Sequence, residues 1–436
     1  MKRLLQTAAA LAIILQATAC SSSGGPVLPD TSILSHGSGA PAVSASANSL
    51  SFTALGPTNA QTFTVSVRGD GALAASSSNS QIASVNPAST QAAAQGGGVK
   101  TATFTVTPVA AGSCTIAVSD KKGGSASVSV TVALAVTSLT VLNAFTIPAS
   151  ETSFGIAGGP TGSVWFTQWM SDSVGRLSAT GVDANSMLDV VPYSSSKPYG
   201  IAYGPDGNFW VADYSNHRIV HVSSTGAILN SLATPYAPTH ITSGPDGNLW
   251  FTEEDTSGAT GFSEVVKLST AGVMTHYPSS AAAQAARNFA YDIVPGPDGR
   301  LWFTEGSVIG AVTTSGVITE YPATGGQSQY IAAGQDGNLW FTQPNSNRIG
   351  RMTISGSASS FTVPTMFATP WQIAAGKDGA VWFTETGGGQ IGRAAPDGTI
   401  TEYAVNNLSG NSAILAAADG NLWVTSYAGK MIVISY

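Results

Sequence analysis

A ten-residue word recurs through the second half of the chain and limits what the chain can fold into. The word reads GPDGNLWFTE at residues 244–253, and close variants begin at residues 204, 296, 334 and 376. A period of about 40 residues with glycine and aromatic punctuation is typical of a β-propeller or a solenoid. The tryptophan follows a glycine by three residues at seven places: Trp165, Trp210, Trp250, Trp302, Trp340, Trp382 and Trp423.

Each repeat divides into four strand-like pieces. The second repeat reads YGIAYGP, NFWVAD, RIVHVSS and AILNSL, with the turn sequences PDGN, YSNH and STG between them. Pro-Asp-Gly is a strong turn signal because proline and glycine supply the backbone angles that a tight turn needs. We therefore expect four-stranded sheets, with each tryptophan on a second strand and packed between neighbouring sheets.

The ends of the repeat region predict a closed ring. The last repeat stops after three strands, at KMIVISY, whereas SLTVLNAFTIPA at 138–149 precedes the first repeat and is a spare strand. Pairing the spare strand with the last repeat would complete the seventh sheet and remove exposed sheet edges. The sequence thus predicts an all-β chain in which residues 137–436 form a seven-bladed β-propeller.

Residues 47–135 alternate apolar and small polar side chains with a period of two, which predicts short strands at β-sandwich spacing. Phe63, Val65 and Val67 should face one core, as should Phe104 and Val106. The stretch VTPVAAGSCTIAVSDKKGGSASVSVTV resembles the bacterial Ig-like domains of surface proteins. We expect an Ig-like β-sandwich here that acts as a spacer, with a separate ligand-binding domain as the alternative.

The N-terminus predicts export. Lys2 and Arg3 precede an apolar run that is too short to span a membrane, and small residues lead to Cys20. Residues 1–19 resemble a bacterial lipoprotein signal peptide, with Cys20 as the lipidated residue; an ordinary signal peptide is the alternative. Residues 20–46, rich in Ser, Gly, Pro and Ala, predict a flexible tether. The expected location is the bacterial cell envelope, at the outer membrane, with the lipid as the membrane contact.

Composition and charge limit the classes of partner that the chain is expected to bind. Charged residues make up 9% of the chain, the net charge is -7, and no basic patch is present, so we expect no nucleic-acid partner. Cys114 is the other cysteine, so we expect no disulfide framework and a buried, hydrophobic role for Cys114. We expect a monomer.

The blade words, together with NRIGRM at 347–352, GQIGRA at 389–394 and GTITEYAV at 398–405, resemble the streptogramin B lyase (virginiamycin B lyase) family. The resemblance covers about 140–436 and implies a seven-bladed propeller, related to NHL-repeat proteins. It also implies an elimination that linearises a cyclic depsipeptide at its ester, with a histidine base and Mg²⁺ held by carboxylates. In the family the histidines stand in Pro-His-x-Ile-like words where a blade begins, once as Glu-Pro-His.

This chain departs from that pattern. The corresponding position, two residues before the Ile or Leu of each blade, holds no histidine, and no glutamate stands two residues earlier. His240 is one residue late, and strand alternation predicts that it faces away unless the strand begins irregularly. His217, His221 and His276 should face solvent. The residues at the histidine position are Phe154, Tyr199, Thr239, Tyr291, Gln329, Trp371 and Ala413.

Acidic and amide side chains stand three residues after each blade tryptophan. In each repeat the second strand ends at the same edge at which the first strand begins. We therefore expect these polar side chains to lie beside Tyr199, Tyr291 and Trp371 at one mouth of the central channel. Acids flanked by aromatics suit a cation, a sugar or a peptide. The alternative is that this Glu bonds to a neighbouring blade. The residues are Gln168, Asp213, Glu253, Glu305, Gln343, Glu385 and Ser426.

Three functions stay open on the sequence. The first is a binding or interaction module that needs no cofactor and takes a small molecule, glycan or peptide at the propeller mouth. The second is a lyase like the resembled family, with His240 and Glu253 as its catalytic pair and Mg²⁺ as its metal. The third is an enzyme acting on a carbohydrate or lactone, with acid and base drawn from Glu253, Glu305 and Glu385.

Overall fold

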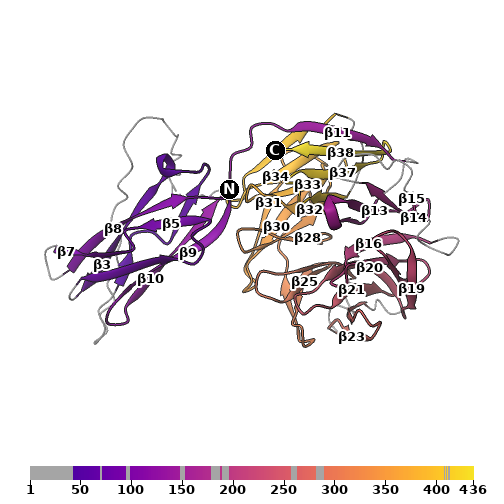
Figure 1. Cartoon of the computed structure of the whole chain (residues 1–436), viewed down its shortest axis with the longest axis horizontal. Coiled ribbons are helices and arrows are strands. Elements are labelled where there is room, and N and C mark those ends of the chain that lie inside the picture. Colours follow the sequence, from indigo (N-terminus) through magenta and orange to yellow (C-terminus); the bar gives the residue numbers. More distant parts are fainter. Residues whose placement is uncertain are drawn as a thin grey trace, which may run out of the picture. The chain divides into compact units, whose positions relative to one another are not determined.

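The computed structural model describes residues 43–68, 71–94, 99–147, 153–177, 187–188, 196–256, 263–280, 289–406, 408, 410 and 413–436. These residues form strands, turns and three short 3-10 helices at Pro57–Asn59, Pro160–Gly162 and Pro344–Ser346 (Figure 1). The all-β prediction is confirmed. No helix in this part of the chain is long and apolar enough to cross a membrane.

The described residues between 43 and 132 form two five-stranded sheets around one core. Phe63, Val65 and Val67 are buried in this core, as alternation predicts. Cys114 is a free cysteine buried among the same apolar side chains. One sheet joins β1 (Val43–Ala45), β3 (Gln61–Arg68), β8 (Val99–Pro108) and β5 (Ala83–Asn86), with β7 (Ala93–Ala94) beside β8; the other joins β2 (Ser49–Phe52), β10 (Ser125–Val132), β9 (Gly112–Asp120), β4 (Ala72–Ser77) and β6 (Ser89–Gln91).

The rest of the described chain forms seven four-stranded sheets, which we number 1 to 7. Strands follow chain order from the innermost outward. Sheet 1 holds β12 (Ile156–Gly158), β13 (Val164–Gln168), β14 (Ser173–Leu177) and β15 (Met187–Leu188); sheet 2 holds β16 (Pro198–Tyr203), β17 (Phe209–Asp213), β18 (Arg218–Val222) and β19 (Ile228–Ala233); sheet 3 holds β20 (Ala237–Ser243), β21 (Leu249–Glu254), β22 (Ser263–Leu268) and β23 (Met274–Pro278). Sheet 4 holds β24 (Ala290–Pro295), β25 (Leu301–Glu305), β26 (Val308–Val312) and β27 (Ile318–Pro322); sheet 5 holds β28 (Ile331–Ala333), β29 (Leu339–Gln343), β30 (Arg348–Met352) and β31 (Ala358–Thr362); sheet 6 holds β32 (Pro370–Ala375), β33 (Val381–Glu385), β34 (Gln390–Ala394) and β35 (Ile400–Ala404).

Sheet 7 is built from both ends of the repeat region. It contains β36 (Ile414–Ala416), β37 (Leu422–Ser426), β38 (Lys430–Ser435) and, as its outermost strand, β11 (Thr140–Thr146). β11 pairs antiparallel with β38, and the two lie side by side in Figure 1. The predicted completion of the last sheet by the spare strand is therefore confirmed. Phe145 of β11 stacks on Trp423, with ring centroids 6.1 Å apart.

The seven blade tryptophans are buried between sheets, as predicted. Trp165 of sheet 1, for example, stacks on Phe209 of sheet 2 at 4.2 Å. In sheets 2 to 7 the indole N–H donates to the aspartate four residues earlier, over 3.0–3.2 Å. The aspartate of the Asp-Gly turn, which follows proline in sheets 2 to 4, thus satisfies a buried donor. In sheet 1 this position is Thr161, and the buried Nε1 of Trp165 has no hydrogen-bond partner among the residues that the structure describes.

This difference predicts a stabilising substitution. Thr161→Asp supplies the missing acceptor, so we expect the free energy of unfolding to rise by about 1 kcal/mol. Asp336→Ala in sheet 5 removes the acceptor of the Trp340 indole N–H and should lower the free energy of unfolding by about 1–3 kcal/mol. Chemical unfolding followed by tryptophan fluorescence measures both, because all nine tryptophans lie at or beyond residue 165. An unchanged midpoint for Asp336→Ala would contradict this role of the aspartate.

Candidate functional site

The seven innermost strands surround a cavity of about 440 Å³. Each sheet contributes one isoleucine to its wall. Each isoleucine lies in register opposite the residue that follows the blade tryptophan, so the repeat itself builds an apolar lining. The seven are Ile156, Ile201, Ile241, Ile293, Ile331, Ile373 and Ile414.

The innermost strands of four sheets begin with a β-bulge. In sheet 3 the register moves from Pro238 opposite Glu253 to Ile241 opposite Phe251, so two residues of β20 face one residue of β21. A bulge re-aims side chains that strict alternation would place on opposite faces. His240 is the second residue of this bulge, and it lines the cavity. The prediction from alternation that His240 faces away is therefore wrong, and the irregular strand start is the reason.

A buried threonine of the repeat fixes this bulge. The Oγ1 atom of Thr252 accepts a hydrogen bond from the backbone N–H of His240 (3.3 Å) and donates to the carbonyl oxygen of Tyr291 in sheet 4 (2.9 Å). Thr167 makes the same pair of contacts between sheets 1 and 2, at 2.9 and 2.8 Å. The threonine of the Trp-Phe-Thr-Glu word thus joins the start of one innermost strand to the next.

The residue just before each lining isoleucine differs in type from sheet to sheet, although the sequence around it repeats. Ile414 pairs with Val424 and is therefore the lining isoleucine of sheet 7. Ala413 stands one residue before it, not two residues before as Tyr199 stands before Ile201, so the predicted alignment of Ala413 was wrong by one residue. A Cβ atom on Gly200 would lie 2.8 Å from the Cα atom of His240, so glycine permits the close approach of sheets 2 and 3. The seven residues are Gly155, Gly200, His240, Asp292, Tyr330, Gln372 and Ala413.

His240 is held with one ring nitrogen free. Its Nδ1 atom lies 2.9 Å from the carbonyl oxygen of Tyr291. A carbonyl oxygen only accepts, so Nδ1 donates, and in the neutral ring Nε2 then has the lone pair. Nε2 is buried and has no hydrogen-bond partner in the described chain. This is the arrangement of a general base whose tautomer is fixed by the backbone.

Asp292 lies near His240 on the cavity wall. Its Oδ1 atom accepts the backbone N–H of Ile293 and its Oδ2 atom that of Ile331, each over 2.9 Å. Burial raises the pKa of the Asp292 carboxyl, and His240 and the two amides offset part of that rise. Asp292 therefore orders the starts of β24 and β28 and places an acidic group beside the histidine.

Aromatic rings surround His240. The ring centroids of Tyr199, Tyr291 and Tyr330 lie 5.0, 5.3 and 5.2 Å from that of His240. The hydroxyls of Tyr199 and Tyr291 are hydrogen-bonded to each other, whereas the buried Tyr330 hydroxyl has no partner in the described chain. Burial raises the pKa of Tyr199 and Tyr330 well above the ordinary value and that of Tyr291 to about 12, so all three stay protonated donors.

The predicted aromatic residues thus lie behind the cavity wall. Tyr199, Tyr291 and Trp371 are first residues of their bulges, and they pack against side chains that line the cavity. Tyr199 stacks on Phe154 at 4.4 Å, and Trp371 lies 5.4 Å from Tyr330.

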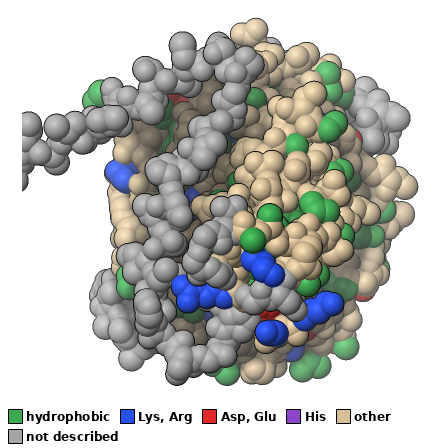
Figure 2. All heavy atoms as spheres, turned by 90° about the vertical axis from the view of Figure 1, so that its left-hand side faces the viewer, with side chains coloured by type: hydrophobic (Ala, Val, Ile, Leu, Met, Phe, Trp, Pro, Cys, Tyr) green, Lys and Arg blue, Asp and Glu red, His purple; other side chains and the backbone are tan. Residues whose placement is uncertain are grey.

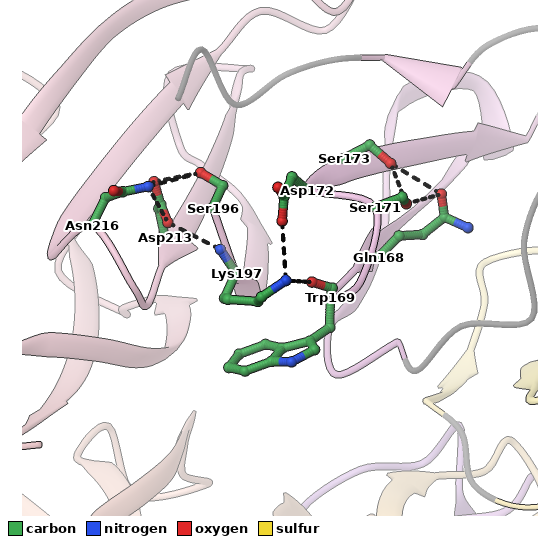
Figure 3. Close-up of polar contacts among 9 residues, drawn as sticks. All are labelled: Gln168, Trp169, Ser171, Asp172, Ser173, Ser196, Lys197, Asp213 and Asn216. Atoms are coloured by element: carbon green, nitrogen blue, oxygen red, sulfur yellow. Dashed lines mark hydrogen bonds and ion pairs between the residues drawn. The ribbon is translucent and has the colours of Figure 1, made fainter. Parts of the chain in front are cut away.

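Lys197 joins sheets 1 and 2 beside Trp169. Figure 3 shows its side chain reaching the loop of sheet 1, where Nζ donates to the Trp169 carbonyl oxygen (3.0 Å) and pairs with Asp172 (3.2 Å). The Trp169 ring lies 5.2 Å from that of Phe154, a cavity-lining residue.

The polar residues three after each tryptophan do not reach the mouth. All seven are buried, and none lines the cavity. Asp213 accepts hydrogen bonds from Ser196 (2.8 Å) and Asn216 (3.0 Å), as Figure 3 shows, and Glu305 accepts one from Ser263 of sheet 3 (2.9 Å). Figure 2 shows another side of the molecule, the one at the left of Figure 1, where few Asp and Glu side chains appear among the described residues. The expected acidic ring at the mouth is therefore wrong, because these side chains point between sheets.

Burial leaves three of these carboxyls with raised pKa values. Burial and the neighbouring Glu264 raise the pKa of Glu253 to about 9, and burial and Glu402 raise that of Glu385 to about 8. Burial raises the pKa of Glu305 to about 7, partly offset by Ser279 and Ser263. Glu253 faces Glu264, not His240, so the predicted catalytic pair is not assembled.

The other histidines differ from one another. His221 is buried, stacks on Trp210 at 3.9 Å and lies 2.7 Å from Asp206, so the prediction that it faces solvent is wrong. Its partner is the turn aspartate that also accepts the indole N–H. His276 is exposed, as predicted, and His217 is half-buried.

The cavity does not suit Mg²⁺. Among the described residues that line it, Asp292 is the one acid, and both of its oxygens accept backbone N–H groups. Nearby Glu254 accepts the Tyr214 hydroxyl at 2.6 Å. Mg²⁺ prefers free carboxylate oxygens and water. The residues present therefore do not fit the metal that the resemblance implies, and no chemical step is derived through it.

Sequence reasoning missed Asp292, Tyr330 and Gln372. A signal for them exists: within an otherwise repeated word, the residue before each lining isoleucine is the one that changes in size and charge. Recognising Asp292 and Gln372 requires the bulge, because each is the second residue of a bulge and lines the cavity.

The raised pKa of Glu385 predicts a pH dependence. In the unfolded chain this carboxyl titrates near 4.5, whereas in the fold it keeps its proton up to about pH 8. The folded chain binds more protons between these values, so stability is highest below the unfolded pKa and falls as pH rises through the folded one. Glu385→Gln should remove part of this fall and stabilise the chain at pH 9 by about 2 kcal/mol. Chemical unfolding at pH 5 and pH 9 measures the free energy of unfolding of both proteins. An equal fall between the two pH values in the wild type and in Glu385→Gln would refute the prediction.

Comparison with known proteins identifies the family of the seven-sheet region. The model of the virginiamycin B lyase family matches residues 184–434. A streptogramin B lyase structure is 29% identical, covers 68% of this chain and 97% of that chain, and has a TM-score of 0.61. Virginiamycin B lyase from Staphylococcus aureus is 26% identical, with 68% and 99% covered and a TM-score of 0.59.

A catalytically inactive variant of the S. aureus enzyme, solved with quinupristin, is 28% identical, with 68% and 99% covered and a TM-score of 0.60. The WD40 propeller domain of Doa1, at 12% identity and a TM-score of 0.54 over 69% and 98%, shares the fold alone. A search of curated proteins returned no match. Because the family model matches more than half of the chain, this β-propeller protein belongs to the virginiamycin B lyase family.

Proposed function

We propose that the central cavity binds a small ligand with aromatic or peptide character that offers both polar and apolar groups. The observation behind this proposal is the cavity of about 440 Å³, walled by seven isoleucines, with His240 and Tyr330 presenting unpartnered polar atoms. Small-molecule sites combine apolar side chains with a few polar groups that orient the ligand, and this cavity contains both. Quinupristin, which was bound to a relative, is the first ligand to test.

The proposal includes an architecture for the chain. The seven four-stranded sheets are the blades of a closed propeller over 137–436, and the two five-stranded sheets are an Ig-like spacer domain over 47–135. Pairing of β11 with β38 supports closure, and the shared core of the two sheets supports the sandwich.

The proposal also places the protein in the bacterial cell envelope. Residues 1–19 act as a lipoprotein signal peptide, Cys20 receives the lipid, and 20–46 tether the domains to the outer membrane. Residues 1–42, including Cys20, lie outside the described residues. The protein acts as a monomer without a nucleic-acid partner, and the lipid alone contacts the membrane.

Ligand binding is tested by calorimetry with quinupristin. We expect saturable binding that Phe154→Ala weakens about tenfold, because Phe154 lines the cavity and a ring contact contributes about 1 kcal/mol or more. Phe367→Ala is the control, since Phe367 is 79% exposed and lies outside the wall. Absence of binding, beside S. aureus virginiamycin B lyase that does bind, would refute a streptogramin-like ligand.

A second candidate is a carbon–oxygen lyase that uses His240. The free Nε2 of His240 favours it, and family membership makes this the enzyme class to test. Nε2 would remove the proton next to the carbonyl carbon of a cyclic depsipeptide. The electrons of that C–H bond form a C=C bond, the ester C–O bond breaks, and the oxygen leaves as a carboxylate. The Tyr330 hydroxyl is the donor placed for the enolate-like oxygen.

This candidate predicts ring opening that depends on His240. Quinupristin is incubated with the purified chain and Mg²⁺, the metal that the family resemblance implies. Because an elimination product keeps the mass of the ring, chromatographic retention and fragmentation report the opening. His240→Ala should lower the rate by about 100-fold or more, because a general base contributes at least that much. His217→Asn is the matched control.

Intact quinupristin in this assay, beside an active lyase that opens it, would leave the binding module as the function. Ring opening that persists in His240→Ala would show that another group is the base. Either result is separable from binding, because calorimetry measures binding without turnover.

A further inference from the structure

A second group of metal-ligating side chains lies in sheet 3, outside the cavity wall. Glu253 on β21, Glu264 on β22 and His276 on β23 each place one ligand atom within 4.8 Å of the other two. Glu253 and Glu264 are directly opposite in register, and the His276 Nδ1 atom is 2.9 Å from Glu264 Oε1. No other group of three or more such residues is found in the described part of the chain.

Among the described residues, neither Glu253 nor Glu264 forms an ion pair with a lysine or an arginine, and His276 is the basic side chain paired with Glu264. Glu253 is fully buried, and neither of its carboxylate oxygens has a hydrogen-bond partner among the described residues. The neighbouring Thr234 hydroxyl donates to the Tyr236 carbonyl oxygen (2.7 Å). Lys267, on the same strand as Glu264, pairs with Asp246 (2.8 Å). Two adjacent buried carboxyl groups are costly to ionise together, so the pair retains a proton until a bound cation replaces it.

We propose that Glu253, Glu264 and His276 bind a divalent transition-metal ion between three neighbouring strands of sheet 3. One imidazole with two carboxylates suits Zn²⁺ or Mn²⁺ better than Mg²⁺ or Ca²⁺, which prefer all-oxygen sets. Ligands at about 2.1 Å from a tetrahedral ion lie about 3.4 Å apart, so small side-chain rotations complete the site. The fourth position takes water.

The ion can enter from the surface, because the His276 side chain is 36% exposed whereas the Glu264 side chain is 5% exposed. Once bound, it ties β21, β22 and β23 together and neutralises the buried carboxylates. None of the three ligands lines the central cavity, so this role is structural and independent of the proposed ligand site.

Sheet 6 offers a matched comparison. Glu385 stands where Glu253 stands in sheet 3, but Gln390 and Glu402 replace Glu264 and His276. Glu402 already accepts the Thr365 backbone N–H (2.8 Å) and hydroxyl (3.1 Å). Sheet 6 therefore has a buried glutamate, Glu385, whose carboxyl oxygens have no hydrogen-bond partner in the described chain, and it lacks the histidine.

The test is calorimetric titration of the chelator-treated, purified chain with ZnCl₂ and with MnCl₂. We expect one equivalent to bind, with the affinity weakened about tenfold or more by His276→Gln and by Glu264→Gln. Glu385→Gln should leave the affinity unchanged. The metal should also raise the thermal unfolding midpoint of the wild type but not of His276→Gln.

His276→Gln decides the result if Glu264→Gln fails to fold, because His276 is at the surface; its tryptophan fluorescence should match that of the wild type. Absence of a one-equivalent site would overturn the proposal. So would a site that keeps its affinity in His276→Gln, or one that is lost in Glu385→Gln.

Discussion

The burial of one tryptophan per sheet against the next sheet is the interaction on which this propeller depends. Each ring covers apolar surface on two sheets, and in six sheets its N–H is satisfied by the turn aspartate four residues earlier. A buried donor without an acceptor costs free energy, so the turn and the packing face are selected together. This coupling explains why Pro-Asp-Gly and Trp recur as one word.

Packing on both faces has a consequence for function. Side chains of a second strand alternate between the two neighbouring sheets, so Trp250 and Thr252 face sheet 4 while Phe251 and Glu253 face the other way. None of them can reach the central channel. The channel is lined by the innermost strands alone, and chemistry at its mouth must come from residues such as His240, Asp292 and Tyr330.

The bulges of sheets 3 and 4 set the directions of the His240 and Asp292 side chains. Thr252 holds the bulge of β20 and also the backbone carbonyl that orients the His240 ring, because Tyr291 O accepts from both. A scaffold residue of the repeat therefore fixes the tautomer of the one histidine that lines the described cavity. The repeated residues build the sheets, and the residue before each lining isoleucine, which differs between sheets, provides the polar groups of the site.

The sequence by itself determined the strands, the four-strand repeat, the closing role of β11 and the buried tryptophans, because period-two patterns and turn residues act locally. It also identified Cys114 and Phe63 as core. Tertiary structure decided the direction of His240, the burial of Glu253 and Glu385, and the pairing of Glu264 with His276. Those depend on a bulge and on which neighbouring sheet a side chain meets, and neither is encoded in the spacing of residues along one strand.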